Sequence, residues 1–319
     1  MMNAVDQVRG FGAPPWRRLV RAERHRLTAP PAVRRVAAGL PLLVLAFGLS
    51  KLFTHSPDTG PALREADARY QEFIEQAART GMPTGSIGPD SFFDDPRYLM
   101  ESLSFGDLRT VLLGLGAAAT VFGIVSGGAD WASRVMLTLT AAEPGRARLF
   151  LTRGVLVGGL SMAATALCGL LLVPCLLLAA HLRGSTGGLD SAYWAVLVSQ
   201  FLRGIVLVGL LALLGYSLAV LTRHVPAALA IAFLYLAGAG RVFGGRGPRL
   251  AEYDMDGLTF AVLNEKPVVP MAESDCISGP GCAATHVDLT AFDGFTGILL
   301  YLLPVLVLAL WRSTRTDVG

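Results

Sequence analysis

Six long apolar runs, separated by polar segments, dominate the sequence. Most approach the roughly 20 residues that a helix needs to cross a bilayer. The run from Val225 to Gly240 is short for a full crossing, and Pro41 bends the first run. The pattern predicts an all-α polytopic membrane protein with about six transmembrane helices. The predicted spans are Val36 to Ser50, Thr110 to Ala129, Gly154 to Ala180, Ile205 to Thr222, Val225 to Gly240 and Gly294 to Trp311.

The arginines indicate how these spans are oriented. Arginine-rich stretches fall on one side of the predicted spans, and positive charge marks the cytoplasmic side of a membrane. An even number of spans then places both the N-terminus and the C-terminus in the cytoplasm, with structured external loops on the other side. The arginine-bearing stretches are residues 1–35, Arg134 to Arg153, Arg223 and the tail with Arg312 and Arg315.

The first polar segment, residues 1–35, contains eight arginines and one helical candidate. Trp16, Leu19, Val20 and Leu27 share a face of that helix. This pattern is typical of an amphipathic helix in the interface of an anionic membrane. It also fits an ordinary basic flank that sets orientation, and the sequence leaves both interpretations open.

Two external segments are expected to be structured. Residues 53–107 form an external helical loop, in which apolar residues recur at helical spacing after Pro61. Residues 241–293 form a second external loop. Its apolar patch from Leu258 to Val269 is too short to span and could dip into the membrane surface.

Charged side chains limit the chemistry of the chain. Charged residues make up 16% of the sequence, well below the ~25% of a soluble domain. The two lysines are Lys51, at the end of the first span with its ammonium free to reach outward, and Lys266. Neither lies in a glycine-rich loop, so the chain has no Walker A motif. With no catalytic constellation either, it is not expected to be an enzyme, to bind a cofactor or a metal, or to bind nucleic acid.

The spans themselves carry few groups for ion coupling. The last five contain no Asp, Glu or Lys, which argues against an ion-driven transporter. Gly123 and Gly127, like Gly154 and Gly158, have the four-residue spacing that allows close helix contact. Arg203 could face an anionic substrate or a lipid headgroup, or simply bound the fourth span, and its place at a span end favours the second interpretation.

The four cysteines form two pairs with different prospects. Cys276 and Cys282 flank a flexible Gly-Pro turn in the predicted external loop, where an oxidising compartment favours a disulfide. Cys168 and Cys175 are seven residues apart in one predicted helix, or about 10 Å. That distance is too long for a bond, so they are packing residues.

Several motifs resemble those of bacterial type-2 ABC exporter permeases. Gly128 to Trp131 (Gly-Ala-Asp-Trp), followed by Glu143-Pro144, is similar to the Gly-Ala-Glu-Trp … Glu-Pro-Arg-Arg segment of that family. Asp95 to Tyr98 resembles its Asp-Pro-Arg-aromatic element, and Leu19 to Arg35 resembles its basic, Glu-containing entry helix. The likeness covers most of the chain in layout and is sharp over about fifty residues around this segment.

The chain also departs from the family in this region. It has Arg134-Val135 where many relatives carry Gly followed by Thr or Ser, and Gly145 where Arg is usual.

The resemblance implies a single transmembrane permease domain over residues 1–319, in which residues 128–148 form the cytoplasmic coupling loop that docks on an ATPase. Type-2 exporters commonly have re-entrant helices just before the last span, and residues 241–293 match that place. A short helix is expected in this loop, with Asp130 at its start. ATP and Mg²⁺ would bind to the partner ATPase subunits, and a second permease copy or paralogue and membrane lipids would be further partners. The residues expected to contact the ATPase are Asp130, Trp131, Val135, Glu143, Pro144 and Arg146.

The expected function is export of an amphipathic substrate (a drug, peptide or lipid) across a bacterial plasma membrane. The main alternative is a membrane sensor or assembly factor that does not transport, with a ligand-binding external layer. An ATPase that associates with the chain would separate the two.

Overall fold

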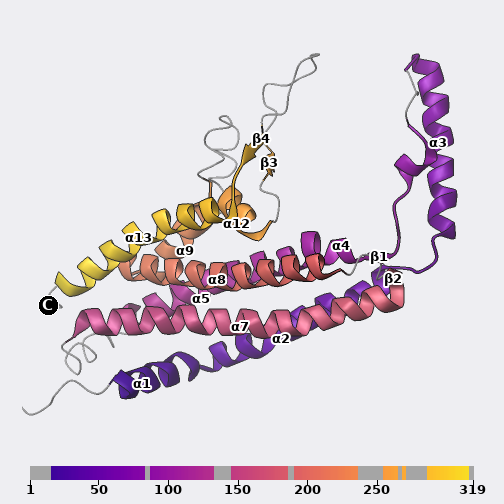
Figure 1. Cartoon of the computed structure of the whole chain (residues 1–319). Helices are drawn as coiled ribbons and strands as arrows, with labels where there is room; N and C mark the ends of the chain where they lie inside the picture. Colours follow the sequence, from indigo (N-terminus) through magenta and orange to yellow (C-terminus); the bar gives the residue numbers. More distant parts are fainter. Residues whose placement is uncertain are drawn as a thin grey trace, which may run out of the picture. The chain divides into compact units, whose positions relative to one another are not determined.

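Figure 1 shows the helices and strands of the computed structural model, whose chain divides into two compact units. Unit 1 comprises residues 1–39, 109–167 and 196–319, and unit 2 comprises residues 40–108 and 168–195. Each unit is described by itself. The described residues are 16–82, 87–132, 145–185, 190–235, 254–264, 268–270 and 286–315.

Within the described residues, five helices are long and apolar enough to cross a membrane. They contain five of the six predicted runs, so the prediction of an all-α, multi-pass membrane protein is confirmed at this level. The described part of the run that begins at Val225 forms helix α9 (Val225–Leu234), and residues 236–240 of the predicted run lie outside the described residues. The count of six spans and the orientation stay predictions. The five long helices are α2 (Pro31–Thr54), α5 (Leu108–Ala132), α7 (Arg146–Arg183), α8 (Ser191–Thr222) and α13 (Ala291–Arg315).

Two of these helices extend well beyond the predicted spans. Helix α7 has 38 residues and α8 has 32. At 1.5 Å per residue they are about 57 Å and 48 Å long, against about 30 Å of hydrocarbon. Trp194 and Arg203, predicted to precede the fourth span, therefore lie inside α8. An apolar run marks only the lipid-embedded part of a helix, because polar residues continue a helix outside the membrane equally well.

In unit 1, α5 and α8 pack backbone to backbone through glycines. A Cβ at Gly123 would collide with the carbonyl oxygen of Ala212, and one at Gly215 with that of Thr120. A Cβ at Gly127 would lie 2.7 Å from the carbonyl oxygen of Tyr216. Close contact at Gly123 and Gly127 agrees with the four-residue spacing seen in the sequence.

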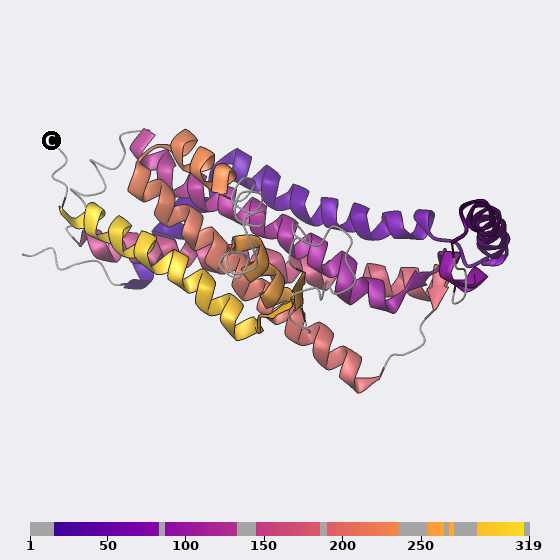
Figure 2. The same ribbon diagram turned by 90° about the horizontal axis from the view of Figure 1, so that it is seen from above.

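The short helix α12 (Met255–Leu263) lies alongside α13 in unit 1 (Figure 2). Gly294 and Gly297 of α13 admit this contact, because a Cβ at either position would collide with Leu258. Strand β3 (Val268–Pro270) follows and pairs antiparallel with β4 (His286–Asp288). The predicted apolar patch from Leu258 to Val269 therefore begins as a buried helix and ends in a strand.

Unit 2 contains the predicted external helix. Helix α3 (Gly60–Thr80) has Pro61 in its first turn and ends at Gly81, whose φ of 67° is the left-handed conformation of a helix C-cap. Its apolar face buries Ala66 and Ala77. The prediction of an ordered helix within residues 53–107 is thus confirmed. The ring of Phe92, in the 3₁₀ turn Pro89–Phe92, lies 5.5 Å from the ring of Phe73.

The chain returns from α3 towards α5 through a compact series of turns in unit 2. Strand β1 (Tyr98–Leu99) pairs in parallel with β2 (Gly184–Ser185), which follows α7 directly. After β1 come one turn of α-helix, α4 (Met100–Ser102), and one π-helical turn (Leu103–Asp107), which leads without a break into α5. Isolated π-helical turns are rare in proteins, and a large share of those known lie at functional sites.

Candidate functional site

The structure places both ends of the predicted coupling loop on long helices of unit 1. Asp130 and Trp131 lie in the last turn of α5, and Arg146 is the first residue of α7. The predicted contact residues Val135, Glu143 and Pro144 lie outside the described residues. The prediction that Asp130 starts a helix is wrong, because α5 continues through Ala132. At a helix C-terminus the backbone dipole does not stabilise a carboxylate, so the stabilisation expected for Asp130 at a helix start does not apply.

Several arginine-bearing helix ends of unit 1 meet where α5 ends. Beside the end of α5, a Cβ at Gly128 would touch Val225, just after α8. The guanidinium of Arg312 in α13 donates to the carbonyl oxygen of Leu221 in α8, at 2.7 Å. The hydroxyl of Tyr216 in α8 donates to the carbonyl oxygen of Phe150 in α7, at 3.3 Å. One end of unit 1 therefore gathers the ends of these four helices.

Helix α1 (Trp16–Thr28) reaches the same end and packs on the start of α7. The guanidinium of Arg148 lies over the ring of Trp16, 5.6 Å from its centroid. Deeper in the contact, Glu23 Oε2 lies 3.7 Å from Arg153 Nε, and the two side chains are only 5% and 7% exposed. Glu23 Oε1 also lies 3.9 Å from Arg26 Nη1. This ion pair joins α1 to α7 in a largely dry environment.

The burial pattern of α1 explains its unusual composition. Leu19, Glu23 and Leu27 recur four apart and form its buried face. The exposed positions of the helix carry Arg17, Arg18, Arg21 and Arg24. Glu23 is the one acidic residue between Trp16 and Thr28. That isolation among arginines was the available signal for a buried ion pair, but the sequence could not identify Arg153 as the partner.

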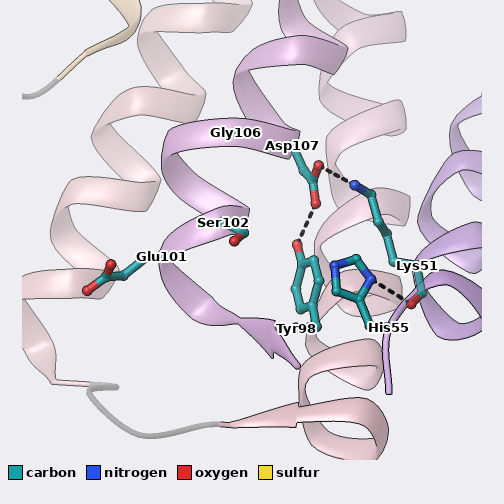
Figure 3. Close-up of a pocket in the computed structure, with 7 residues that line it drawn as sticks. All are labelled: Lys51, His55, Tyr98, Glu101, Ser102, Gly106 and Asp107. Carbon is teal, nitrogen blue, oxygen red and sulfur yellow. Dashed lines mark hydrogen bonds and ion pairs between the residues drawn. The ribbon is translucent and has the colours of Figure 1, made fainter. Parts of the chain in front are cut away.

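A second cluster of charged and polar side chains lies in unit 2 (Figure 3). Lys51 Nζ, near the end of α2, lies 2.8 Å from Asp107 Oδ1 in the π-helical turn. Tyr98 Oη donates to the other carboxylate oxygen, Oδ2, also at 2.8 Å. Lys51 therefore does not reach freely outward, as the sequence suggested, but pairs with a carboxylate. Sequence reasoning missed this pair because 56 positions separate the two residues.

The position of Tyr98 depends on the turn that precedes it. Asp95 accepts hydrogen bonds from the backbone N–H of Arg97 at 3.0 Å and from its guanidinium at 2.7 Å. These bonds to Arg97 hold the pKa of Asp95 below its ordinary value. Burial, then the hydrogen bond to Asp107, raise the pKa of Tyr98, so its hydroxyl stays protonated and remains a donor. The Asp-Pro-Arg-Tyr element thus orients Tyr98 towards Asp107.

The cluster borders a hollow of about 480 Å³. The ring of His55 lies edge-on to that of Tyr98, at 5.2 Å between centroids. Glu101 points away from the ion pair (Figure 3). In the described part of the chain no three His, Cys, Asp or Glu side chains lie close enough to hold a metal ion. The hollow is lined by Lys51, His55, Tyr98, Glu101, Ser102, Gly106 and Asp107.

Asp107→Asn is expected to destabilise unit 2 by roughly 1.5–3 kcal/mol, because it removes the charge that pairs with Lys51 and accepts from Tyr98. Thermal unfolding of the purified chain in detergent measures the loss. Glu101→Gln is the matched control: it removes the same charge from an exposed side chain of the same hollow and should have little effect. Equal midpoints for Asp107→Asn and the unmodified chain would contradict a stabilising role for this cluster.

The cysteine predictions have different outcomes. Cys276 and Cys282 lie outside the described residues, so their disulfide stays a prediction. Cys168 and Cys175 are both free, in helix α7. A Cβ at Gly48 of α2 would lie 2.9 Å from the Cβ of Cys175, which agrees with the predicted packing role.

Comparison with protein family models, with curated proteins and with solved structures finds no match to this chain.

Proposed function

We propose that this chain is the permease subunit of an ATP-driven exporter of the ABC type-2 class. The observation that supports the proposal most is the arrangement at the end of unit 1 where α5 stops and α7 begins. Residues 128–148 connect these two long apolar helices, and the basic helix α1 is joined to α7 there by the Glu23–Arg153 ion pair. A segment that connects two spans, with a basic helix packed beside the start of the second span, is a suitable docking surface for a soluble partner.

In this proposal the partner is an ABC-type ATPase with ATP and Mg²⁺ bound. The exposed arginines of α1 and the ends of the 128–148 segment face it from the cytoplasmic side of a bacterial plasma membrane. A second copy of the chain, or a paralogue, completes the transporter. ATP-driven movement of the ATPases pushes on residues 128–148 and reshapes the surface between the two permeases.

The substrate of the proposed exporter is an amphipathic molecule such as a drug, a peptide or a lipid. The long helices expose large apolar side chains to their surroundings. Their ends carry arginines and hydroxyl groups. Surfaces of this kind favour a molecule with an apolar body and a polar or anionic head.

The experiment that tests the proposal is purification of the full chain from its native membrane together with whatever is bound to it. The expected result is co-purification of an ATPase with a P-loop, and ATP hydrolysis by the complex in lipid vesicles. If the chain carries no ATPase but binds a ligand through its external segments, the exporter proposal is rejected in favour of a membrane sensor or assembly factor.

A further inference from the structure

Two arginines from different long helices approach the same turn of α12 in unit 1. The guanidinium of Arg109, at the start of α5, lies over the ring of Phe260, 4.9 Å from its centroid. Arg203 of α8 donates from Nη1 to the carbonyl oxygen of Asn264 at 3.4 Å. The backbone N–H of Asn264 donates to the carbonyl oxygen of Phe260, so these two residues close the last turn of α12. Both guanidinium groups therefore meet at the end of one short helix.

The packing of α5 on α8 holds the two arginines near each other. A Cβ at Gly204 would collide with the side chain of Leu112, so the two helices are in close contact there. Arg203 precedes Gly204, and Arg109 lies three residues before Leu112, about one turn away. Both cations are thus fixed by a rigid helix contact.

No described acidic residue is paired with either of these two cations. Among the residues that the structure describes, no carboxylate lies within ion-pair distance of Arg109 or Arg203. The Nε of Arg109 is buried and has no hydrogen-bond partner. The hydrogen bonds from Arg203 to Asn264 and to Ser199 are long, at 3.3–3.4 Å. A guanidinium has five N–H donors, and two half-buried cations with no counter-charge among the described residues form a site for an anion.

The depth of the site identifies the class of anion. Arg109 lies 21 residues from Asp130 along α5, or about 31 Å at 1.5 Å per residue. That length matches the thickness of the hydrocarbon core, so Arg109 lies at the level of the lipid phosphates when the other end of α5 reaches the opposite boundary. Arginine binds phosphate through parallel N–H bonds.

Apolar surface for the rest of the ligand lies on the same stretch of α8. Val206 is exposed and lies about one turn beyond Arg203, on the side towards the middle of the membrane when the two arginines lie at the level of the phosphates. An acyl chain can lie against this part of α8 while its headgroup reaches the arginines. We propose that Arg109 and Arg203, with the end of α12, bind the phosphate of a phospholipid headgroup. This inference does not depend on the exporter proposal.

The test measures lipid binding to the full chain purified in a neutral maltoside detergent. Short-chain phosphatidylglycerol is titrated, and the apparent dissociation constant is read from the shift in the thermal unfolding midpoint. The double variant Arg109→Gln/Arg203→Gln is expected to weaken binding at least about tenfold, since it removes both charges that pair with the phosphate. Arg109→Lys/Arg203→Lys keeps both charges but loses the planar fork, and should give a smaller loss.

The matched control is Arg79→Gln, which removes the same charge from an exposed position of α3. It should leave the dissociation constant unchanged. Diacylglycerol with the same chains tests the headgroup, and inorganic phosphate tests the free anion. Equal binding of diacylglycerol, or equal weakening by Arg79→Gln, would overturn the proposed site. Inorganic phosphate that stabilises the protein as well as the phospholipid does would reject the lipid in favour of a soluble phosphate. If the Gln variant does not fold, full-strength binding by the Lys variant overturns the proposal.

Discussion

Replacing Trp131 by alanine is expected to abolish substrate-stimulated ATP hydrolysis by the reconstituted complex. Trp131 lies in the last turn of α5 and belongs to the 128–148 segment. A buried aromatic anchor in a protein interface contributes roughly 2 kcal/mol or more, and removing it at the proposed contact lowers both binding of the ATPase and transmission of force. ATP turnover is measured in lipid vesicles with and without substrate. The variant should reach the membrane at normal abundance.

Trp311→Ala is the matched control for this experiment. Trp311 also lies near the end of a long apolar helix, α13, and 53% of its surface is exposed. If Trp131 merely anchors a helix end in the interfacial layer of the membrane, the two alanine variants should behave alike. Unchanged hydrolysis in Trp131→Ala would remove residues 128–148 from the proposed coupling surface.

Replacing Arg153 by methionine is expected to destabilise the chain by about 3–5 kcal/mol. The change leaves Glu23 with a charge that is 95% shielded from solvent and has lost its partner at 3.7 Å, while Arg26 at 3.9 Å remains. A buried carboxylate that keeps only the 3.9 Å contact with Arg26 is costly, because that contact offsets only part of the hydration that the carboxylate lost on burial. The free energy of unfolding is compared in detergent by denaturant titration of the two proteins.

The double variant Glu23→Gln/Arg153→Met separates the charge effect from loss of packing. Removing both charges should recover much of the stability, because replacing a whole buried ion pair is far less harmful than breaking it. Arg24→Met, on the exposed side of α1, is the control and should change little. A double variant as unstable as Arg153→Met alone would show that the charge of Glu23 is not the source of the effect.

The fold was predictable where one local pattern decides it. Apolar runs located the long helices, and the spacing of Leu63, Tyr70 and Phe73 after Pro61 located α3. Helix α1 was visible in the alternation of arginines with Leu19 and Leu27. In each case the information lies within one or two turns of the element itself, because helical hydrogen bonds and amphipathic spacing are local.

The contacts that build the candidate sites were not predictable in the same way. The pairs Lys51–Asp107, Glu23–Arg153 and Arg109–Phe260 join residues on different helices. In the sequence alone, a charged residue next to an apolar run has the same pattern as an ordinary span boundary. Its partner is identified only when the helix that faces it is known. The error at Asp130 has a similar origin, since α5 packs against Tyr216 of α8 at Gly127 and continues to Ala132, and the sequence did not reveal that contact.

The glycine contact between α5 and α8 makes the two helices one rigid unit. Backbone atoms meet at Gly123 and Gly215, and no side chain lies between them to change rotamer and absorb a displacement. Sliding or rolling one helix on the other would drive a carbonyl oxygen into the opposite backbone. A force applied at the end of α5 near Ala132 therefore moves α5 and α8 as one rigid body, and Arg109 and Arg203 at the other end move together.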